Sequence, residues 1–195
     1  ARAMTSAPNP LTSPLMKTVD DVLKFWFVDH GQEDWFGARA EFDALISEQF
    51  APTYAAVARG EAWRWRTTPA GRLAEIIVLD QFPRQLFRGQ AEAFASDAMA
   101  LALAQEAVAG GHHNFLPMPQ RMFLLLPYQH SESPIVQAES VRLHTALGVP
   151  DLLKFAEGHA AAIARFGRFP KRNAALGRTS TPEEEEYIAN SEGMF

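Results

Sequence analysis

The chain has 195 residues, a length that suits one domain with a sizeable core, and 47% of them are apolar. Its 23 acidic and 18 basic residues give a net charge of −5, which argues against nucleic-acid binding, because non-specific binding relies on excess lysine and arginine. No cysteine is present, so disulfides and thiolate metal sites are excluded. No apolar run approaches the roughly 20 residues that a membrane helix needs, and we expect a cytoplasmic protein.

The amino-terminal residues differ in composition from the rest of the chain. Residues 1–16 are mostly Ala, Pro, Ser, Thr and Asn, and they lack the apolar core of a signal peptide. We therefore expect a disordered leader over 1–16 and a single folded domain over 17–195.

From residue 18 onward, apolar residues recur with helical spacing, and no segment alternates as a strand would. Thr18 is a predicted N-cap, and the first helix is expected to end at Gly31. Trp35-Phe36-Gly37 is expected to form an aromatic loop, and Pro52 to break or kink the second helix.

The next predicted helix begins at Thr68-Pro69, an N-cap followed by proline at the first helical position. Asp80 lies on its apolar stripe, four residues after Ile76. A buried carboxylate is costly unless it is paired or hydrogen-bonded. Pro83 is expected to stop this helix and to release Arg84 close to Asp80. We therefore predict a polar site at this chain break.

Two further regions carry polar residues of interest. A short helix over 119–126 is expected to end at Pro127, and the polar loop after it carries His130 and Glu132. A later, longer helix places His159 on an apolar face, where a lone histidine usually has a structural role.

A basic turn is predicted where the long helix over 150–166 ends at Gly167. Its cations are Arg165, Arg168, Lys171 and Arg172. The helix dipole favours cations at this end by only about 0.3–1 kcal/mol each, so we expect these arginines to have a further use.

The complete pattern predicts an all-α, single-domain fold of about eight or nine antiparallel helices joined by short connections. Several motifs then resemble a bacterial family of unknown function, number nine hundred and twenty-four in the series of such domains. They are Phe25-Trp26-Phe27, Leu79-Asp80-Gln81-Phe82-Pro83-Arg84, Phe87-Arg88-Gly89, His130-Ser131-Glu132, Arg165-Phe166-Gly167-Arg168-Phe169-Pro170, Arg172-Asn173 and Leu176-Gly177-Arg178.

The resemblance covers about residues 19–188 and implies stacked helical hairpins similar to those of tetratricopeptide-repeat proteins. It implies no established activity. Two positions depart from the pattern: Gln85 stands where asparagine is expected, and Lys171 where histidine is expected.

The first functional hypothesis is a site that binds an anionic small molecule or a peptide carboxylate, without a cofactor or a metal. Arginine suits planar, bidentate contact with carboxylates and phosphates, and arginines gather at two predicted helix ends. The expected ligand-binding residues are Asp80, Arg84, Arg88, His130, Glu132, His159, Arg165, Arg168 and Arg172.

Two alternatives use the same residues. A hydrolase-type enzyme would employ His130, Glu132 and Asp80 as acid–base groups, since histidine changes charge near neutral pH. The histidines and acids lack the HExxH spacing of a helical zinc site. A buried ion-pair network without any ligand would also pair inward-facing acids with arginines.

Overall fold

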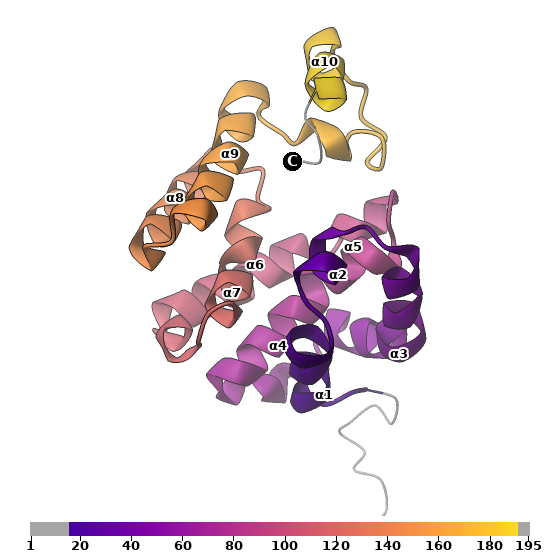
Figure 1. Cartoon of the computed structure of the whole chain (residues 1–195), viewed down its shortest axis with the longest axis vertical. Coiled ribbons are helices and arrows are strands. Elements are labelled where there is room, and N and C mark those ends of the chain that lie inside the picture. The colour runs from indigo at the N-terminus through magenta and orange to yellow at the C-terminus, as the bar shows by residue number, and fades with distance from the viewer. Residues whose placement is uncertain (1–15, 191–195) are drawn as a thin grey trace, which may run out of the picture.

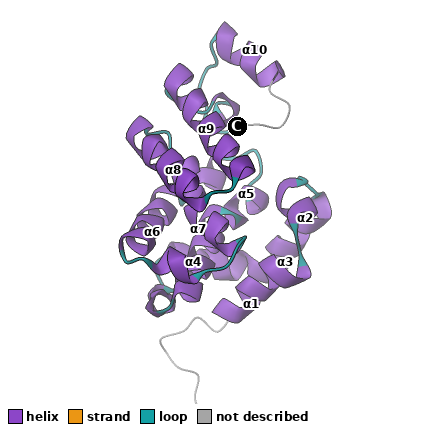
Figure 2. Cartoon of the chain, turned by 60° about the vertical axis from the view of Figure 1, so that its left-hand side comes forward, coloured by secondary structure: helices purple, strands orange, loops and turns teal. Residues whose placement is uncertain are grey.

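The computed structural model describes residues 16–190, and within this range every regular element is a helix (Figure 2). The predicted all-helical class is therefore confirmed, whereas the stacking of tetratricopeptide repeats stays a prediction. No helix in the described range is long and apolar enough to cross a bilayer. The expected leader lies outside the described residues except for Met16, which packs against the main core.

The first helix begins as predicted and ends at Asp29, two residues before Gly31. Thr18 and Asp21 form a capping box at the start of α1 (Val19–Lys24), in which each side chain accepts a hydrogen bond from the other's backbone N–H. A π-helical segment, η1 (Phe25–Asp29), continues it, and His30 follows as the C-cap. Gly31 instead precedes α2 (Gln32–Phe36), so Trp35 and Phe36 lie in a short helix and not in the expected loop.

Prolines act differently in different helices. α3 (Ala40–Ala58) runs as one helix through Pro52, and α7 (Gln120–Gln129) runs through Pro127, which was expected to end it. Proline removes one backbone hydrogen bond, but buried side chains on both sides of each proline keep the helix packed against the core. α4 (Pro69–Asp80) does end before Pro83, which lies in the first turn of α5 (Phe82–Leu86). Arg84 is therefore helical.

α4 is the centre of the fold, because its residues from Leu73 to Asp80 are all fully buried. It contacts α6 (Asp97–Ala109) and α7 on one side and α1 and α3 on the other (Figure 1). Thr68 caps its amino terminus as predicted, by accepting a hydrogen bond from the backbone N–H of Gly71. The position of Asp80 at the end of this buried helix brings a carboxylate into the middle of the molecule.

The carboxyl-terminal helices form a second layer. α8 (Pro134–Leu147) and α9 (Pro150–Phe166) pack side by side at the upper left of Figure 1. Gly148 and Gly167 end them with φ values of 67° and 70°, left-handed conformations that favour glycine. α10 (Pro182–Asn190) follows at the top of the view. The short 3₁₀ segments are η2 (Trp63–Thr67), η3 (Ala91–Phe94), η4 (His112–Phe115) and η5 (Pro170–Arg172).

Candidate functional site

A cavity of about 680 Å³ opens between α2 and α5 on one side and α7 and α9 on the other. α2, α7 and α9 supply most of its apolar lining, which consists of Trp35, Phe36, Ala38, Met122, Leu126, Leu152 and Phe155. Its polar lining includes Arg84, Arg88, His130 and His159, together with the amides of Gln81, Gln85 and Gln129. The cavity therefore has the mixed surface of a small-molecule site, apolar with a few polar groups.

Asp80 is fully buried next to this cavity and is hydrogen-bonded to His130. Its Oδ1 lies 2.7 Å from His130 Nδ1, and the Gln81 amide donates to Oδ2. Arg84 Nη1 lies 3.7 Å from Oδ1 and also donates to the Asp80 backbone oxygen. These contacts satisfy a carboxylate that would otherwise be costly to bury, and the prediction that Asp80 needs partners is confirmed.

The Asp80–His130 pair has a defined protonation state at neutral pH. Burial works against ionisation of Asp80, but His130 and Arg84 outweigh it and hold the pKa of this carboxyl well below its usual range. Burial, with the nearby Arg84 cation, lowers the pKa of His130 although Asp80 acts in the opposite direction. His130 is therefore neutral, its Nδ1–H donates to Asp80, and its Nε2 carries a lone pair.

Asp97 connects two arginines behind the cavity. Arg84 donates to both of its carboxylate oxygens at 3.0 and 3.1 Å, and Arg172 donates to one at 3.2 Å. Arg172 also donates to the backbone oxygen of His130 at 2.9 Å, and its guanidinium lies over the ring of Phe169. Arg172 thus positions the chain around His130 but does not line the cavity.

The other residues of the predicted basic turn lie elsewhere. Arg168 pairs with Glu184 at 2.7 and 2.8 Å, and Arg165 pairs with Glu183 at 2.7 Å. These contacts fasten α10 to the end of α9, and none of the four residues lines the cavity. The structure therefore places Arg165 and Arg168 in an ion-pair group separate from Asp80 and His130.

Glu132 also lies outside the cavity lining, although it follows His130 closely in sequence. Its carboxylate accepts from Arg178 at 2.8 and 3.0 Å and from the backbone N–H of Phe169 at 2.7 Å. Glu132 thus holds the segment after α9 against the end of α7. Arg88, in contrast, lines the cavity with a half-exposed side chain that pairs with Asp43 at 2.7 Å.

Sequence reasoning missed several residues of this arrangement. Asp97 opens an alanine-rich helix, where an acid only suggests interaction with the helix dipole. Gln81 adjoins Asp80, and this adjacency is a signal that could have found it. The aromatic residues Trp35 and Phe36 were expected in an anchoring loop, and no local pattern shows that they face α7 and α9 across a cavity.

Comparison with known proteins places the chain in a family. The model of DUF924, described as a bacterial protein of unknown function, matches residues 22–192. The chain belongs to this family. The chain is similar to a solved structure of a protein of unknown function, ATU0120 from Agrobacterium tumefaciens, with 38% sequence identity and a TM-score of 0.82. The aligned region covers 87% of this chain and 96% of that protein. No curated protein matches the chain.

The resemblance read from the motifs is thus confirmed, and the DUF924 description names no activity. The two departures from the expected pattern lie in different surroundings. Gln85 lines the cavity, whereas Lys171 does not. No cluster of three or more metal-ligating His, Cys, Asp or Glu side chains occurs among the residues that the structure describes.

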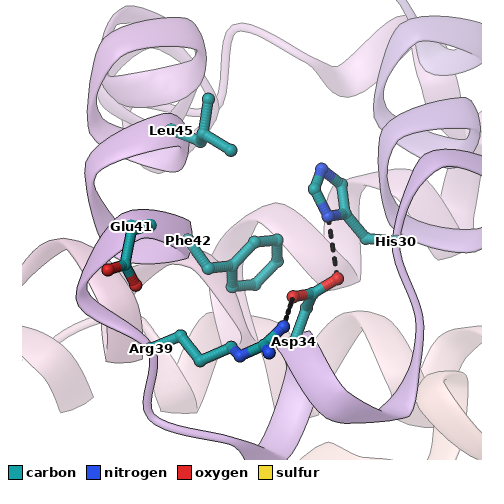
Figure 3. A pocket seen from close by; sticks show the side chains of 6 residues that line it. All are labelled: His30, Asp34, Arg39, Glu41, Phe42 and Leu45. Carbon is teal, nitrogen blue, oxygen red and sulfur yellow. Dashed lines mark hydrogen bonds and ion pairs between the residues drawn. The ribbon is translucent and has the colours of Figure 1, made fainter.

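A second cavity of this DUF924 protein, of about 380 Å³, lies between η1, α2 and α3 (Figure 3). Asp34 lines it between His30 and Arg39, with its carboxylate 2.9 Å from His30 Nδ1 and 3.1 Å from Arg39 Nη1. The hydrogen bond from His30, more than any other contact, lowers the pKa of Asp34. Asp34 is already paired with both His30 and Arg39, so this pocket supports a structural role in which these contacts hold α2 against the start of α3.

The lowered pKa of His159 predicts that the folded protein loses stability in mild acid. Burial, aided by the neighbouring His130, lowers its pKa from 6.5 to about 3. Below pH 6.5 the unfolded chain binds a proton at His159, whereas the folded protein binds it only near pH 3. Protonation therefore favours the unfolded state, and the free energy of unfolding falls as the pH decreases. We expect the melting temperature to fall between about pH 7 and about pH 5, with a smaller fall in His159→Gln.

Thermal melts at both pH values check this prediction, with His112→Gln on η4 as the matched control. The control should keep the pH dependence of the wild type. An unchanged dependence in His159→Gln would show that His159 is readily protonated in the folded protein.

Proposed function

We propose that the protein binds a small organic acid with an apolar body in the cavity between α2, α5, α7 and α9. The observation that carries this proposal is the charge of the lining. Within the described residues, its permanently charged members are Arg84 and Arg88, and no Asp or Glu lines it. The partner carboxylates, Asp97 and Asp43, lie outside the lining and hold the two guanidinium groups in place.

This arrangement favours a carboxylate over a polyanion. The partner carboxylates offset much of the positive charge, so the attraction that remains suits one negative group. Because Asp43 and Asp97 already order both arginines, little side-chain entropy is lost when a ligand binds. Guanidinium groups also match the planar geometry of a carboxylate.

The apolar lining argues for an apolar body on the ligand. Phe36 is 63% exposed and Phe155 is 49% exposed, although both line the cavity. Exposed apolar surface gathered at a concave site often marks a binding surface. Burying it against a ligand contributes about 25 cal/mol per Å², and the exclusion of water also strengthens the contact with the arginines.

Gln85 supports a polar contact inside the same cavity. It is 7% exposed, and its Oε1 has no hydrogen-bond partner in the described part of the chain. A buried acceptor of this kind costs free energy unless a donor arrives, and that donor would be a hydroxyl or N–H on the body of the ligand, since its carboxylate only accepts.

Thermal melting with 4-phenylbutyrate and its neutral amide, 4-phenylbutanamide, tests this function. The acid should raise the melting temperature more than the amide at equal concentration, since only the acid meets Arg84 and Arg88 with a charge. Arg88→Gln should weaken binding of the acid about tenfold, the loss expected from one charge-assisted hydrogen bond of about 1.4 kcal/mol.

The matched control is Arg142→Gln, which removes an exposed arginine paired with Glu139 on α8, away from the cavity lining. This variant should bind the acid as the wild type does. Equal stabilisation by the acid and the amide, or equal weakening in both variants, would contradict the proposed function.

A further inference from the structure

The cavity also contains the parts of a hydrolytic site. We propose that His130 is a general base that activates water there, and that Asp80 positions it, for hydrolysis of an ester or amide of an organic acid. The substrate class rests on the proposed function, because the acyl part would occupy the apolar lining. The catalytic argument rests independently on the geometry of three residues, Asp80, His130 and Arg84.

The Asp80–His130 contact fixes the base. A fully buried carboxylate holds His130 Nδ1 at 2.7 Å, so the tautomer with a lone pair on Nε2 is selected. His130 lines the cavity with a side chain that is 15% exposed, and with Nδ1 held by Asp80 we infer that Nε2 is the nitrogen open to the cavity. No described residue hydrogen-bonds to Nε2, so a water molecule can.

The lining also decides the nucleophile. Among the described lining residues there is no Ser, Thr, Lys or Tyr, and the chain contains no cysteine. A covalent acyl intermediate through one of these side chains therefore has no attachment point in the cavity. Water remains as the nucleophile, and the reaction is a single displacement by general-base catalysis.

His130 Nε2 takes one proton from water while the water oxygen forms a bond to the acyl carbon. Arg84, which lines the cavity and lies 3.7 Å from the Asp80 carboxylate, stabilises the negative charge that develops on the carbonyl oxygen. The bond from the acyl carbon to the leaving oxygen or nitrogen then breaks. The leaving group receives the proton from His130 or departs as an anion while His130 returns the proton to solvent.

The charges around His130 keep it ready to accept a proton at neutral pH. Burial and Arg84 lower its pKa, whereas Asp80 and Asp97 raise it. Arg172 on η5 donates to its backbone oxygen, and the ring of His159 on α9 lies 6.1 Å away. When the proton from water arrives, the ionised Asp80 stabilises the imidazolium, as it does in catalytic Asp–His pairs.

The test uses two esters as probes, 4-nitrophenyl acetate and 4-nitrophenyl hexanoate, and follows the release of 4-nitrophenolate. We expect His130→Gln to lose about a hundredfold in the enzyme-dependent rate, the lower range for a general base. The matched control is His112→Gln on η4, which should keep the wild-type rate. It measures how much of the rate comes from non-specific catalysis by a histidine outside the cavity. The hexanoate should react faster than the acetate in the wild type, since its chain fills the apolar lining.

The pH profile of the hydrolysis rate distinguishes a role of Asp80 in positioning His130 from a purely structural role. The wild-type rate should rise with pH and reach half its maximum below 6.5, the ordinary imidazole value. Because Asp80 raises the pKa of His130, Asp80→Asn should move this midpoint to lower pH as well as lower the rate. A purely structural aspartate would leave the midpoint unchanged.

Equal rates for the wild type and a folded His130→Gln would overturn this inference, as would an acyl-enzyme detected by mass spectrometry. If His130→Gln does not fold, diethyl pyrocarbonate on the wild type replaces it. Loss of the rate in step with carbethoxylation of His130, reversed by hydroxylamine, supports the base, and a full rate with His130 labelled overturns it.

The two proposals fail in different ways. Binding of 4-phenylbutyrate without His130-dependent hydrolysis removes only the catalytic inference. Hydrolysis that depends on His130 without binding of the acid removes only the proposed function.

Discussion

Replacing Asp80 by alanine is expected to lower the free energy of unfolding by about 3–5 kcal/mol. The side chain is fully buried, and its carboxylate receives hydrogen bonds from His130 and Gln81 and the charge of Arg84. Its removal leaves the Gln81 amide and the His130 N–H without their acceptor and the Arg84 cation with one carboxylate fewer. For a domain of this size, the melting temperature should fall by roughly 6–20 °C.

The control for Asp80→Ala is Asp43→Ala. Asp43 also pairs with an arginine, Arg88, but the Arg88 side chain is half exposed. Ion pairs at the surface contribute only about 0.2–1 kcal/mol. Urea unfolding of both variants measures the difference. Similar losses in the two would show that Asp80 is solvated like Asp43, and the interpretation of Asp80 as the buried centre of the site would have to be given up.

Replacing Trp26 by alanine is expected to cost about 3–5 kcal/mol, because it empties the middle of an aromatic cluster. Trp26 is fully buried, and its ring contacts those of Trp35, Phe42, Phe82 and Phe123. Its backbone oxygen also accepts a 2.9 Å hydrogen bond from Trp35 Nε1. Because Trp35 lines the cavity, Trp26→Ala should also weaken binding of 4-phenylbutyrate.

Trp26→Phe is the comparison variant for Trp26→Ala. The indole Nε1 of Trp26 is buried without a hydrogen-bond partner in the described residues, so phenylalanine removes an unsatisfied donor along with some volume. We expect this variant to lose much less stability than Trp26→Ala in urea unfolding. If both variants lose the same amount, a partner of the indole N–H carries the stability and the packing argument is wrong.

Local sequence signals determined where many helices begin and end. Hydroxyl side chains before a proline mark the starts at Thr68 and Ser133, and the structure shows each hydroxyl accepting from a backbone N–H of the first turn. Gly148 and Gly167 mark two ends, where φ is positive. These interactions span only a few residues, so their chemistry is legible in the sequence.

The burial of Asp80 was predictable for a related reason. Helical spacing places it four residues after Ile76, on a stripe that must face the core, and the cost of burying a carboxylate then demands partners. Arg84, four residues further on, was foreseen as one of them. His130 was foreseen as a site residue but not as the hydrogen-bond partner, since fifty residues separate the two.

The tertiary structure alone decided how the remaining charges pair and where the chain is hollow. Arg172 meets Asp97 across 75 residues, and Arg168 meets Glu184 across 16, in contacts that no local spacing encodes. Pro127 lies inside a helix because packing on both sides outweighs one lost hydrogen bond. The cavity itself exists because α2 and α5 face α7 and α9 without filling the space between them, which depends on the relative positions of four helices and not on any one of their sequences.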